Sequence, residues 1–162
     1  MEKLICIKIE EFGSQGELTA GDRELLELAV KACDSSYSPY STFRVGAAVR
    51  MANGEFLSGS NQENAAYPSG LCAERVVLFY AQAKYPGIAA EAIAVYARTD
   101  EFKLDRPVTP CGACRQVIAE HESRYGTKTR VIMGGANGSV VITEGIENLL
   151  PLMFQLDQLK KK

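Results

Sequence analysis

Hydrophobic positions in the first part of the chain repeat at the spacing of a helix. Between residues 22 and 36 the apolar side chains fall three and four positions apart, which predicts a helix with one buried face. Thr19 or Asp22 is placed to cap its first turn, and the Ser- and Pro-containing stretch 35–41 is expected to form a loop after it. Cys33 lies on or beside the buried face, so we interpret it as a core residue. The apolar positions of this helix are Leu25, Leu26, Leu28, Ala29 and Ala32.

The pattern then changes to strands. Residues 43–50 and 55–60 flank Asn53 and Gly54, a pair that favours a tight turn, so the two segments are predicted to form an antiparallel hairpin. Three small residues at 46–48 would let another element, most simply a helix, pack closely on the first strand.

Three further strands are predicted in the second half. Residues 88–97 have the pattern of a buried strand, and 129–133 and 139–143 are rich in β-branched residues. The link between the last two is too short for the crossover that a parallel pair needs, so they should pair antiparallel if they are adjacent. A short helix is expected over 144–150.

Two more helices are predicted, over 71–84 and from about 111 to 121, and each has a cysteine in its first turn. Together with the strands they indicate an α/β fold in three layers, with a mixed five-stranded sheet and helices on both faces. We expect residues 1–162 to form a single domain. Residues 1–20 are an N-terminal extension whose role the sequence does not indicate.

Within that extension, residues 4–9 are rich in β-branched side chains and are interpreted as a strand. Cys6 is expected to be a small buried group, because unpaired cysteines are among the most buried residues.

Composition narrows the classes of function. The 162 residues are 46% hydrophobic and 23% charged, with a formal net charge of −2 and a pI near 5.5, which does not favour a nucleic-acid-binding protein. The apolar runs are too short to span a membrane, and no secretory signal is recognisable. Five cysteines, an odd number, argue against a disulfide framework. A cytoplasmic location is expected.

Three of the cysteines have the pattern of a metal site. Cys111 and Cys114 are three residues apart and share one helical face, and Cys72 begins the preceding helix. Helix N-termini lower the pKa of a thiol and so favour the thiolate that zinc binds. Three sulfur ligands with no obvious fourth are typical of a catalytic zinc site, which keeps one position for water.

Glu74 is the candidate acid-base group of this site. It lies two residues after Cys72, where its carboxylate could move protons to and from a water at the metal. Arg75 or Arg115 could compensate the charge of three thiolates on Zn²⁺. His121 is interpreted as a surface residue, since its neighbours in sequence are polar. The reaction class indicated is metal-assisted hydrolysis.

Two other interpretations of the thiols remain open. The pair Cys111 and Cys114 could be a redox dithiol, although it lies late in the chain with Pro110 directly before it. A structural zinc module without activity is a second alternative. The carboxylate of Glu74 argues against that module, because a scaffold has no use for an acid beside its metal.

Four motifs together resemble the zinc-dependent nucleoside deaminases, and specifically cytidine deaminases of the small homotetrameric type. They are Phe43-Arg44-Val45-Gly46-Ala47-Ala48, Gly59-Ser60-Asn61-Gln62-Glu63-Asn64-Ala65-Ala66-Tyr67, Cys72-Ala73-Glu74-Arg75 and Pro110-Cys111-Gly112-Ala113-Cys114-Arg115-Gln116. The resemblance extends from about residue 37 to 154. It implies the cytidine deaminase-like fold, and hydrolysis of cytidine and deoxycytidine to uridine and deoxyuridine with release of ammonia.

The resemblance also implies roles for particular residues. Cys72, Cys111 and Cys114 would hold one Zn²⁺ per subunit, and Glu74 would transfer protons between water and the pyrimidine. Asn61 and Glu63 would bind the ribose hydroxyls, and the main chain at Ala73 would meet the base edge. Phe43 would pack near the nucleoside, although core packing is an equal alternative. Phe154 of a neighbouring subunit would cover the base, with core packing again the alternative.

A homotetramer with shared sites, taking a free nucleoside in pyrimidine salvage, is therefore expected, with neither nucleic acid nor membrane as a partner. The nearest rival is a deaminase of the same fold that acts on a cytosine-containing antibiotic such as blasticidin S. Its metal site would be the same, so the substrate alone distinguishes the two.

Overall fold

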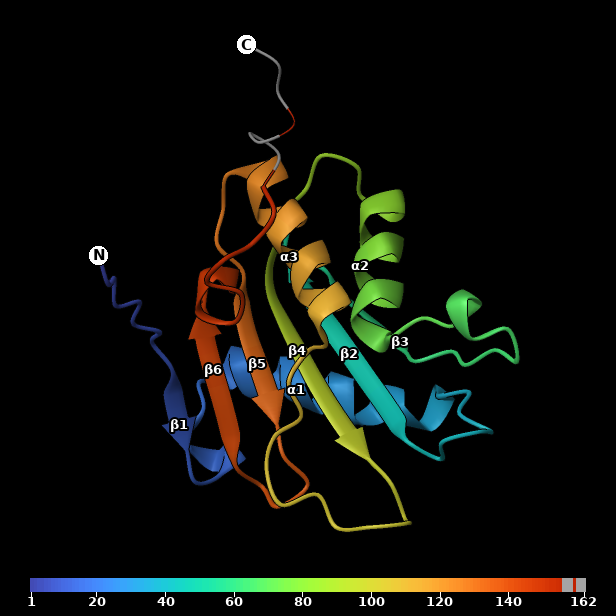
Figure 1. The fold of residues 1–162 in the computed structure, drawn as a ribbon. Coiled ribbons are helices and arrows are strands. Elements are labelled where there is room, and N and C mark those ends of the chain that lie inside the picture. Colours follow the sequence, from blue (N-terminus) through green and yellow to red (C-terminus); the bar gives the residue numbers. More distant parts are fainter. Residues whose placement is uncertain (156–158, 160–162) are drawn as a thin grey trace.

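A mixed sheet of six strands lies between two layers of helices in the computed structural model, which describes residues 1–155 and 159 (Figure 1). The strands follow the order β1-β6-β5-β4-β2-β3 across the sheet. The β4–β5 pair is parallel and the others are antiparallel. The strands are β1 (Glu10–Phe12), β2 (Arg44–Met51), β3 (Phe56–Ser60), β4 (Ala90–Arg98), β5 (Arg130–Gly134) and β6 (Val140–Glu144).

The helices divide between the two faces of the sheet. α1 (Ala20–Ala32) covers one face, and α2 (Ala73–Lys84) and α3 (Gly112–Tyr125) cover the other (Figure 1). Within residues 1–155 and 159, none of the helices is long and apolar enough to cross a membrane. Short 3₁₀ helices complete the described elements: η1 (Gln15–Glu17), η2 (Cys33–Ser35), η3 (Tyr67–Ser69) and η4 (Ile146–Asn148).

Alternating strand positions build two cores. Ala47 and Val49 of β2 face the layer of α2 and α3, whereas Ala48 faces α1. The predicted close approach is found at Gly46, where an added Cβ would lie 2.0 Å from the carbonyl oxygen of Ala29 in α1. Only glycine fits there, because backbone cannot retreat as a flexible side chain can.

The predicted fold class is confirmed, and so are most of its elements. Thr19 caps α1 by accepting a hydrogen bond from the Asp22 N–H at 3.2 Å, and Cys33 is fully buried. The hairpin forms with Gly54 at φ 86°, and β5 and β6 pair antiparallel. The helix expected over 144–150 is reduced to the single turn of η4.

The sheet has six strands rather than the predicted five, and the N-terminal strand was assigned to the wrong residues. Residues 4–9 were interpreted as a strand, but the strand that forms is β1, where Glu10 lies opposite Ile142 and Phe12 opposite Val140. β6 ends at Glu144, so residues further toward the N-terminus run beyond the end of their partner. Cys6, predicted to be buried, is exposed for the same reason.

His121 was also placed wrongly, because it is buried between α2 and α3 instead of on the surface. Its Nε2 accepts a hydrogen bond from the Ala90 N–H at 2.9 Å, and its Nδ1 lies 3.3 Å from the side-chain nitrogen of Gln82. The prediction relied on the polar neighbours of His121 in the sequence. Adjacent residues of a helix point in different directions, so polar neighbours can be exposed while His121 itself is buried.

Candidate active site

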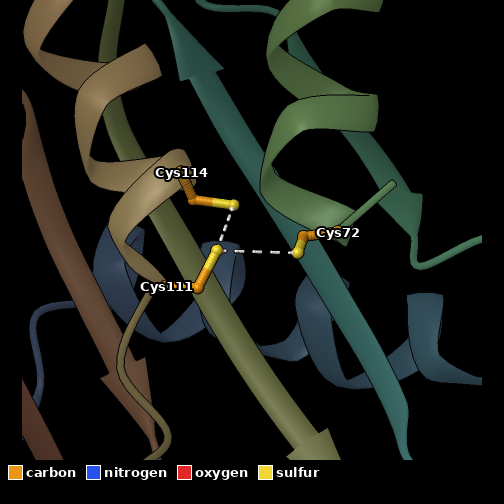
Figure 2. A group of neighbouring side chains, drawn as sticks. All are labelled: Cys72, Cys111 and Cys114. Atoms are coloured by element: carbon orange, nitrogen blue, oxygen red, sulfur yellow. Dashed lines mark hydrogen bonds between the residues drawn. The ribbon is translucent and has the colours of Figure 1, made fainter. Parts of the chain in front are cut away.

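Three thiols converge where α2 and α3 begin (Figure 2). Cys72 and Cys111 are the N-cap residues of the two helices, and Cys114 lies in the first turn of α3. The Sγ atoms of Cys72 and Cys111 are 3.7 Å apart, those of Cys111 and Cys114 are 3.5 Å apart, and all three lie within 4.8 Å of one another. Tetrahedral zinc with sulfur at about 2.3 Å requires sulfur atoms about 3.8 Å apart. The spacing therefore fits one zinc ion held by three thiolates.

The surroundings of the cluster favour thiolates. Both helix N-termini place partial positive charge at the sulfurs. The neighbouring Cys114 thiol, assisted by Arg75, lowers the pKa of Cys72 to about 5 against the opposing effect of burial. The same contact with Cys72 raises the pKa of Cys114. Zinc would take the place of the protons that the thiols share, because it binds the deprotonated form.

Arg75 is the cation beside these sulfurs. Its Nη2 lies 3.9 Å from Cys72 Sγ, while its Nε is buried without a hydrogen-bond partner among the described residues. This position would allow Arg75 to compensate the charge of the thiolates, which stays a prediction. Arg115 instead donates to two backbone carbonyl oxygens and to the hydroxyl of Thr109, so its guanidinium is directed to these oxygen atoms rather than to the thiols.

Glu74 follows the Cys72 cap by two residues and is buried, with 4% of its surface exposed. Burial raises the pKa of Glu74, and hydrogen bonding by its own backbone and by Cys114 partly offsets this effect. The carboxyl group thus lies beside the thiol cluster and out of bulk water. Such a group is suited to accept a proton and return it.

A pocket of about 470 Å³ opens next to Cys72 and Arg75, in the size range of small-molecule sites. It reaches from these residues to Asn61 and Glu63, the two polar residues expected to hold a sugar. Phe43, Ala73, Glu74 and Phe154 are not among its lining residues in the described chain. The lining residues are Tyr40, Ser41, Asn61, Gln62, Glu63, Asn64, Tyr67, Gly70, Leu71, Cys72 and Arg75.

Asn61 is held by three internal hydrogen bonds. Its Oδ1 accepts from Ser36 Oγ at 2.5 Å and from the Val45 N–H at 2.8 Å, and its Nδ2 donates to the Phe43 carbonyl at 2.9 Å. Both acceptor positions of the amide oxygen are filled, so one N–H remains to face a ligand. Asn61 thereby ties the start of β2 to the loop that follows η2, a positioning role that the sequence did not suggest.

The side chain of Glu63 is held by hydrogen bonds from the loop that contains Tyr40 and Ser41. One carboxylate oxygen accepts from the Tyr40 N–H at 2.9 Å and from the Ser41 N–H at 3.3 Å, and the other accepts from the Ser41 hydroxyl. The hydrogen bond from Ser41 is the main reason that the pKa of Glu63 is lowered. The carboxylate is therefore ionised at neutral pH and already oriented at the wall of the pocket.

The two aromatic residues expected near the nucleoside, Phe43 and Phe154, differ in burial and in contacts. Phe43 is half-buried and stacks on Phe102, with ring centroids 6.3 Å apart and planes 18° apart. Phe154 is 55% exposed, and its carbonyl oxygen accepts from Gln116 Nε2 at 2.9 Å. Ala73, the first residue of α2, is fully buried. The side chain of Phe154 is thus largely outside the hydrophobic core of the chain.

Arg115 is a functional candidate whose role sequence reasoning missed. Its Nε donates to the Pro110 carbonyl at 2.7 Å, its Nη1 to the Leu149 carbonyl at 2.7 Å, and its Nη2 to Thr109 Oγ1 at 3.1 Å. The side chain therefore joins the loop before Cys111 to the segment that leads to Phe154. Its place directly after Cys114 is the only signal in the sequence.

Comparison with known proteins agrees with this geometry. The profile of the cytidine and deoxycytidylate deaminase zinc-binding region matches residues 19–137. The chain belongs to this family. A cysteine triad within reach of one metal ion is consistent with the zinc-binding region that the family is named for.

Individual relatives cover most of the chain. The cytidine deaminase of Halalkalibacterium halodurans is 41% identical over 142 residues, 85% of this chain and 98% of that protein. The solved cytidine deaminase from Burkholderia pseudomallei is 39% identical with a TM-score of 0.70, over 85% of this chain and 100% of that one. A blasticidin-S deaminase from Bacillus cereus is 31% identical over 82% of this chain and 91% of its own length.

Proposed function

We propose that this chain hydrolyses cytidine and deoxycytidine to uridine and deoxyuridine, with release of ammonia. The observation that carries the proposal is the thiol cluster with a buried carboxylate, Glu74, beside a pocket of about 470 Å³. The cytidine deaminase relatives that match nearly end to end support the substrate class. One Zn²⁺ per subunit, held by Cys72, Cys111 and Cys114, completes the proposed site.

Zinc bound by the three thiolates would supply Lewis-acid activation of water, lowering its pKa to about 7. Glu74 performs the proton transfers. It accepts a proton from the attacking water and delivers it to N3 as the oxygen bonds to C4 of the pyrimidine. It then moves the remaining hydroxyl proton to the amino group, so that the C4–N bond breaks, ammonia leaves and the C4 carbonyl forms.

The rest of the pocket would hold the nucleoside. Glu63 is an ionised, fixed carboxylate that can accept from a ribose hydroxyl, and Asn61 keeps one N–H to offer. The backbone at Ala73, at the start of α2, would meet the base edge, and Phe43 would pack near the nucleoside. Arg75 would balance the negative charge of the thiolates.

The proposed assembly is a homotetramer in which Phe154 covers the base in a neighbouring subunit. The exposed side chain of Phe154, away from the pocket of its own chain, supports this sharing. Phe154→Ala should weaken nucleoside binding. Mixing Phe154→Ala subunits with inactive Glu74→Gln subunits should restore part of the activity, and no rescue after verified mixing would contradict the shared site.

Salvage of free pyrimidine nucleosides in the cytoplasm is the proposed setting. Deamination of blasticidin S is a second candidate, because a relative with that name matches 82% of the chain. The cytidine deaminase relative is more similar, at 41% against 31% identity, which favours the nucleoside.

Ultraviolet absorbance of cytidine incubated with the zinc-loaded protein tests the proposal. Loss of the cytidine band, with equimolar ammonia, is expected for the native chain and not for Glu74→Gln. Blasticidin S is offered in a parallel reaction and as a competitor. Turnover of the antibiotic alone would establish the second candidate, and no turnover of either with zinc bound would refute both.

A further inference from the structure

The first nine residues, here called the arm, form a largely apolar segment whose isoleucines the rest of the described chain leaves about half exposed. Figure 1 shows residues 1–9 running from β1 away from the sheet. The exposed fractions of Ile5, Ile7 and Ile9 are 48%, 56% and 45%. The arm precedes the region that matches the deaminase family, which begins at residue 19. The exposed isoleucines of the arm are therefore not explained by the shared fold.

The arm continues an open edge of the sheet. β1 is the outermost strand, and its one neighbour in the described sheet is β6. An unpaired edge with β-branched residues is a template for another strand. β6 ends at Glu144 and does not extend to residues 1–7, so a strand that pairs with this part of the arm would come from elsewhere.

The direction of one hydrogen bond shows which backbone groups of the arm face outward. The Lys8 N–H donates to Asn148 Oδ1 at 2.7 Å, on the side of the arm where β6 lies. Backbone groups of successive strand residues point to opposite sides. In an extended arm, the N–H and carbonyl groups of Ile5, Ile7 and Ile9 therefore face the open edge.

We propose that the arm pairs antiparallel with the arm of a second copy of this chain, about a two-fold axis at Ile7. Ile7 then lies opposite Ile7 of the partner subunit, and Ile5 lies opposite the partner's Ile9. Lys3 lies opposite the partner's Glu11, and symmetry repeats each pair. Three apolar pairs are thus flanked by two pairs of opposite charge, which is the pattern that stabilises neighbouring strands.

The charges select this register among the alternatives. A shift by one residue would place residues whose N–H and carbonyl groups face the open edge opposite partner residues whose groups face away from it. The two arms could not then form hydrogen bonds with each other. A shift by two residues toward the C-terminus would place Lys8 opposite Lys8 of the partner subunit, and the same shift toward the N-terminus would place Glu2 opposite the partner's Glu10. Like charges directly opposite one another are destabilising, so the charges disfavour the shifted registers.

Disulfide trapping tests the register. In a Cys6→Ser background loaded with zinc, Ile7→Cys should form a covalent dimer with oxidised glutathione, because directly opposed strand residues have Cα atoms about 5.5 Å apart, within disulfide range. Ile5→Cys and Ile9→Cys are the matched controls. Neither lies opposite its own copy, so each alone should cross-link at the background rate, whereas a mixture of the two should cross-link efficiently.

Charge exchange provides a second test with the same measurement. Lys3→Glu in the Ile7→Cys protein should slow cross-linking at least about fivefold, because it sets Glu opposite Glu11 at two symmetric positions. Adding Glu11→Lys should restore the rate. The proposal is overturned if Ile7→Cys cross-links no faster than the Cys6→Ser background, if all three single cysteines react alike, or if Glu11→Lys fails to rescue. The arm lies outside the proposed active site, so these outcomes do not depend on cytidine turnover.

Discussion

The two ends of the candidate pocket are built in opposite ways. At the metal end, Cys72, Cys111 and Cys114 contact one another and Arg75, and Arg75 Nε has no hydrogen-bond partner among the described residues. At the proposed sugar end, the side chains of Asn61 and Glu63 form hydrogen bonds with the protein itself. A bound metal ion would complete the arrangement at the metal end, whereas the side chains of the proposed sugar end are already fixed by the protein.

This difference suggests that one end of the pocket mainly determines substrate affinity and the other mainly determines the rate of the chemical step. Residues fixed in advance cost little ordering on binding and set affinity and position. A group that exchanges protons beside a metal acts mainly on the transition state. Substitutions at the two ends should therefore affect different kinetic constants, and the predictions below test that separation.

The largest effect is expected for Glu74→Gln, which keeps the shape of the side chain and removes its ability to transfer protons. The turnover number kcat should fall by about a thousandfold or more, since general acid-base groups contribute up to about 10⁴. Zinc content, measured by atomic absorption, should stay at the native level because Glu74 is not a proposed ligand.

Glu63→Gln is the matched control at the sugar end. It also replaces a carboxylate with an amide, but it should act chiefly on KM and leave kcat within about tenfold of the native value. A fall in kcat as large as that of Glu74→Gln, with KM unchanged, would contradict the separation between the two ends.

Asn61→Ala should reduce the stability of the fold as well as substrate affinity. It removes three hydrogen bonds and leaves the Val45 N–H and the Phe43 carbonyl without this partner. At about 1 kcal/mol for each bond, the free energy of unfolding should fall by about 3 kcal/mol. Urea denaturation of the zinc-loaded protein measures this loss. A native unfolding midpoint together with a raised KM would show that Asn61 acts on the ligand alone.

Arg115→Lys should have a smaller effect. It weakens the link that the Arg115 side chain makes between the metal end and the C-terminal segment. Lysine keeps the charge but cannot reach Pro110, Thr109 and Leu149 together, since its ammonium is a single point. We expect faster hydrogen exchange in residues 149–154 and about tenfold faster zinc release to a chelator. Equal exchange in both proteins would mean that Arg115 does not position this segment.

The thiol cluster was the part of the site most open to prediction from sequence. Its ligands are close together within each of two short motifs, and helix geometry places Cys111 and Cys114 on one side of α3. The helices and the hairpin were equally predictable, because their apolar periods and turn residues are local. β4 to β6 followed from β-branched runs and a short connecting loop.

Features that depend on distant partners were not predictable. The location of β1 depends on where β6 ends, which the N-terminal sequence does not encode. The hydrogen bonds of Asn61 reach Ser36 and Val45, and those of Arg115 reach Leu149, over separations that no periodicity reveals. A polar residue whose partner is remote in sequence looks like a surface residue, and His121 was misplaced for that reason.

The smallest effect is expected at His121, which lies in the C-terminal half of α3 and contacts Gln82 of α2. Because Nε2 accepts the Ala90 N–H, the neutral ring carries its proton on Nδ1, and the Gln82 amide is expected to turn its oxygen toward it. Burial lowers the pKa of His121 below its usual 6.5, and the charge of Arg124 acts in the same direction. The neutral ring therefore stabilises the attachment of β4 to α3.

The sign of the pH effect follows from that lowered pKa. Below about pH 6.5 the unfolded chain binds a proton that the native protein does not, so this contribution to stability is complete above pH 6.5 and is lost as the pH falls toward the native pKa. The slope should reach at most about 1.4 kcal/mol per pH unit. His121→Gln, whose amide oxygen can still accept the Ala90 N–H, should lack this slope. Urea denaturation of both proteins between pH 7.5 and 5.5 isolates the difference, since the other titrating groups are common to the two, and parallel curves would show that His121 does not titrate with unfolding.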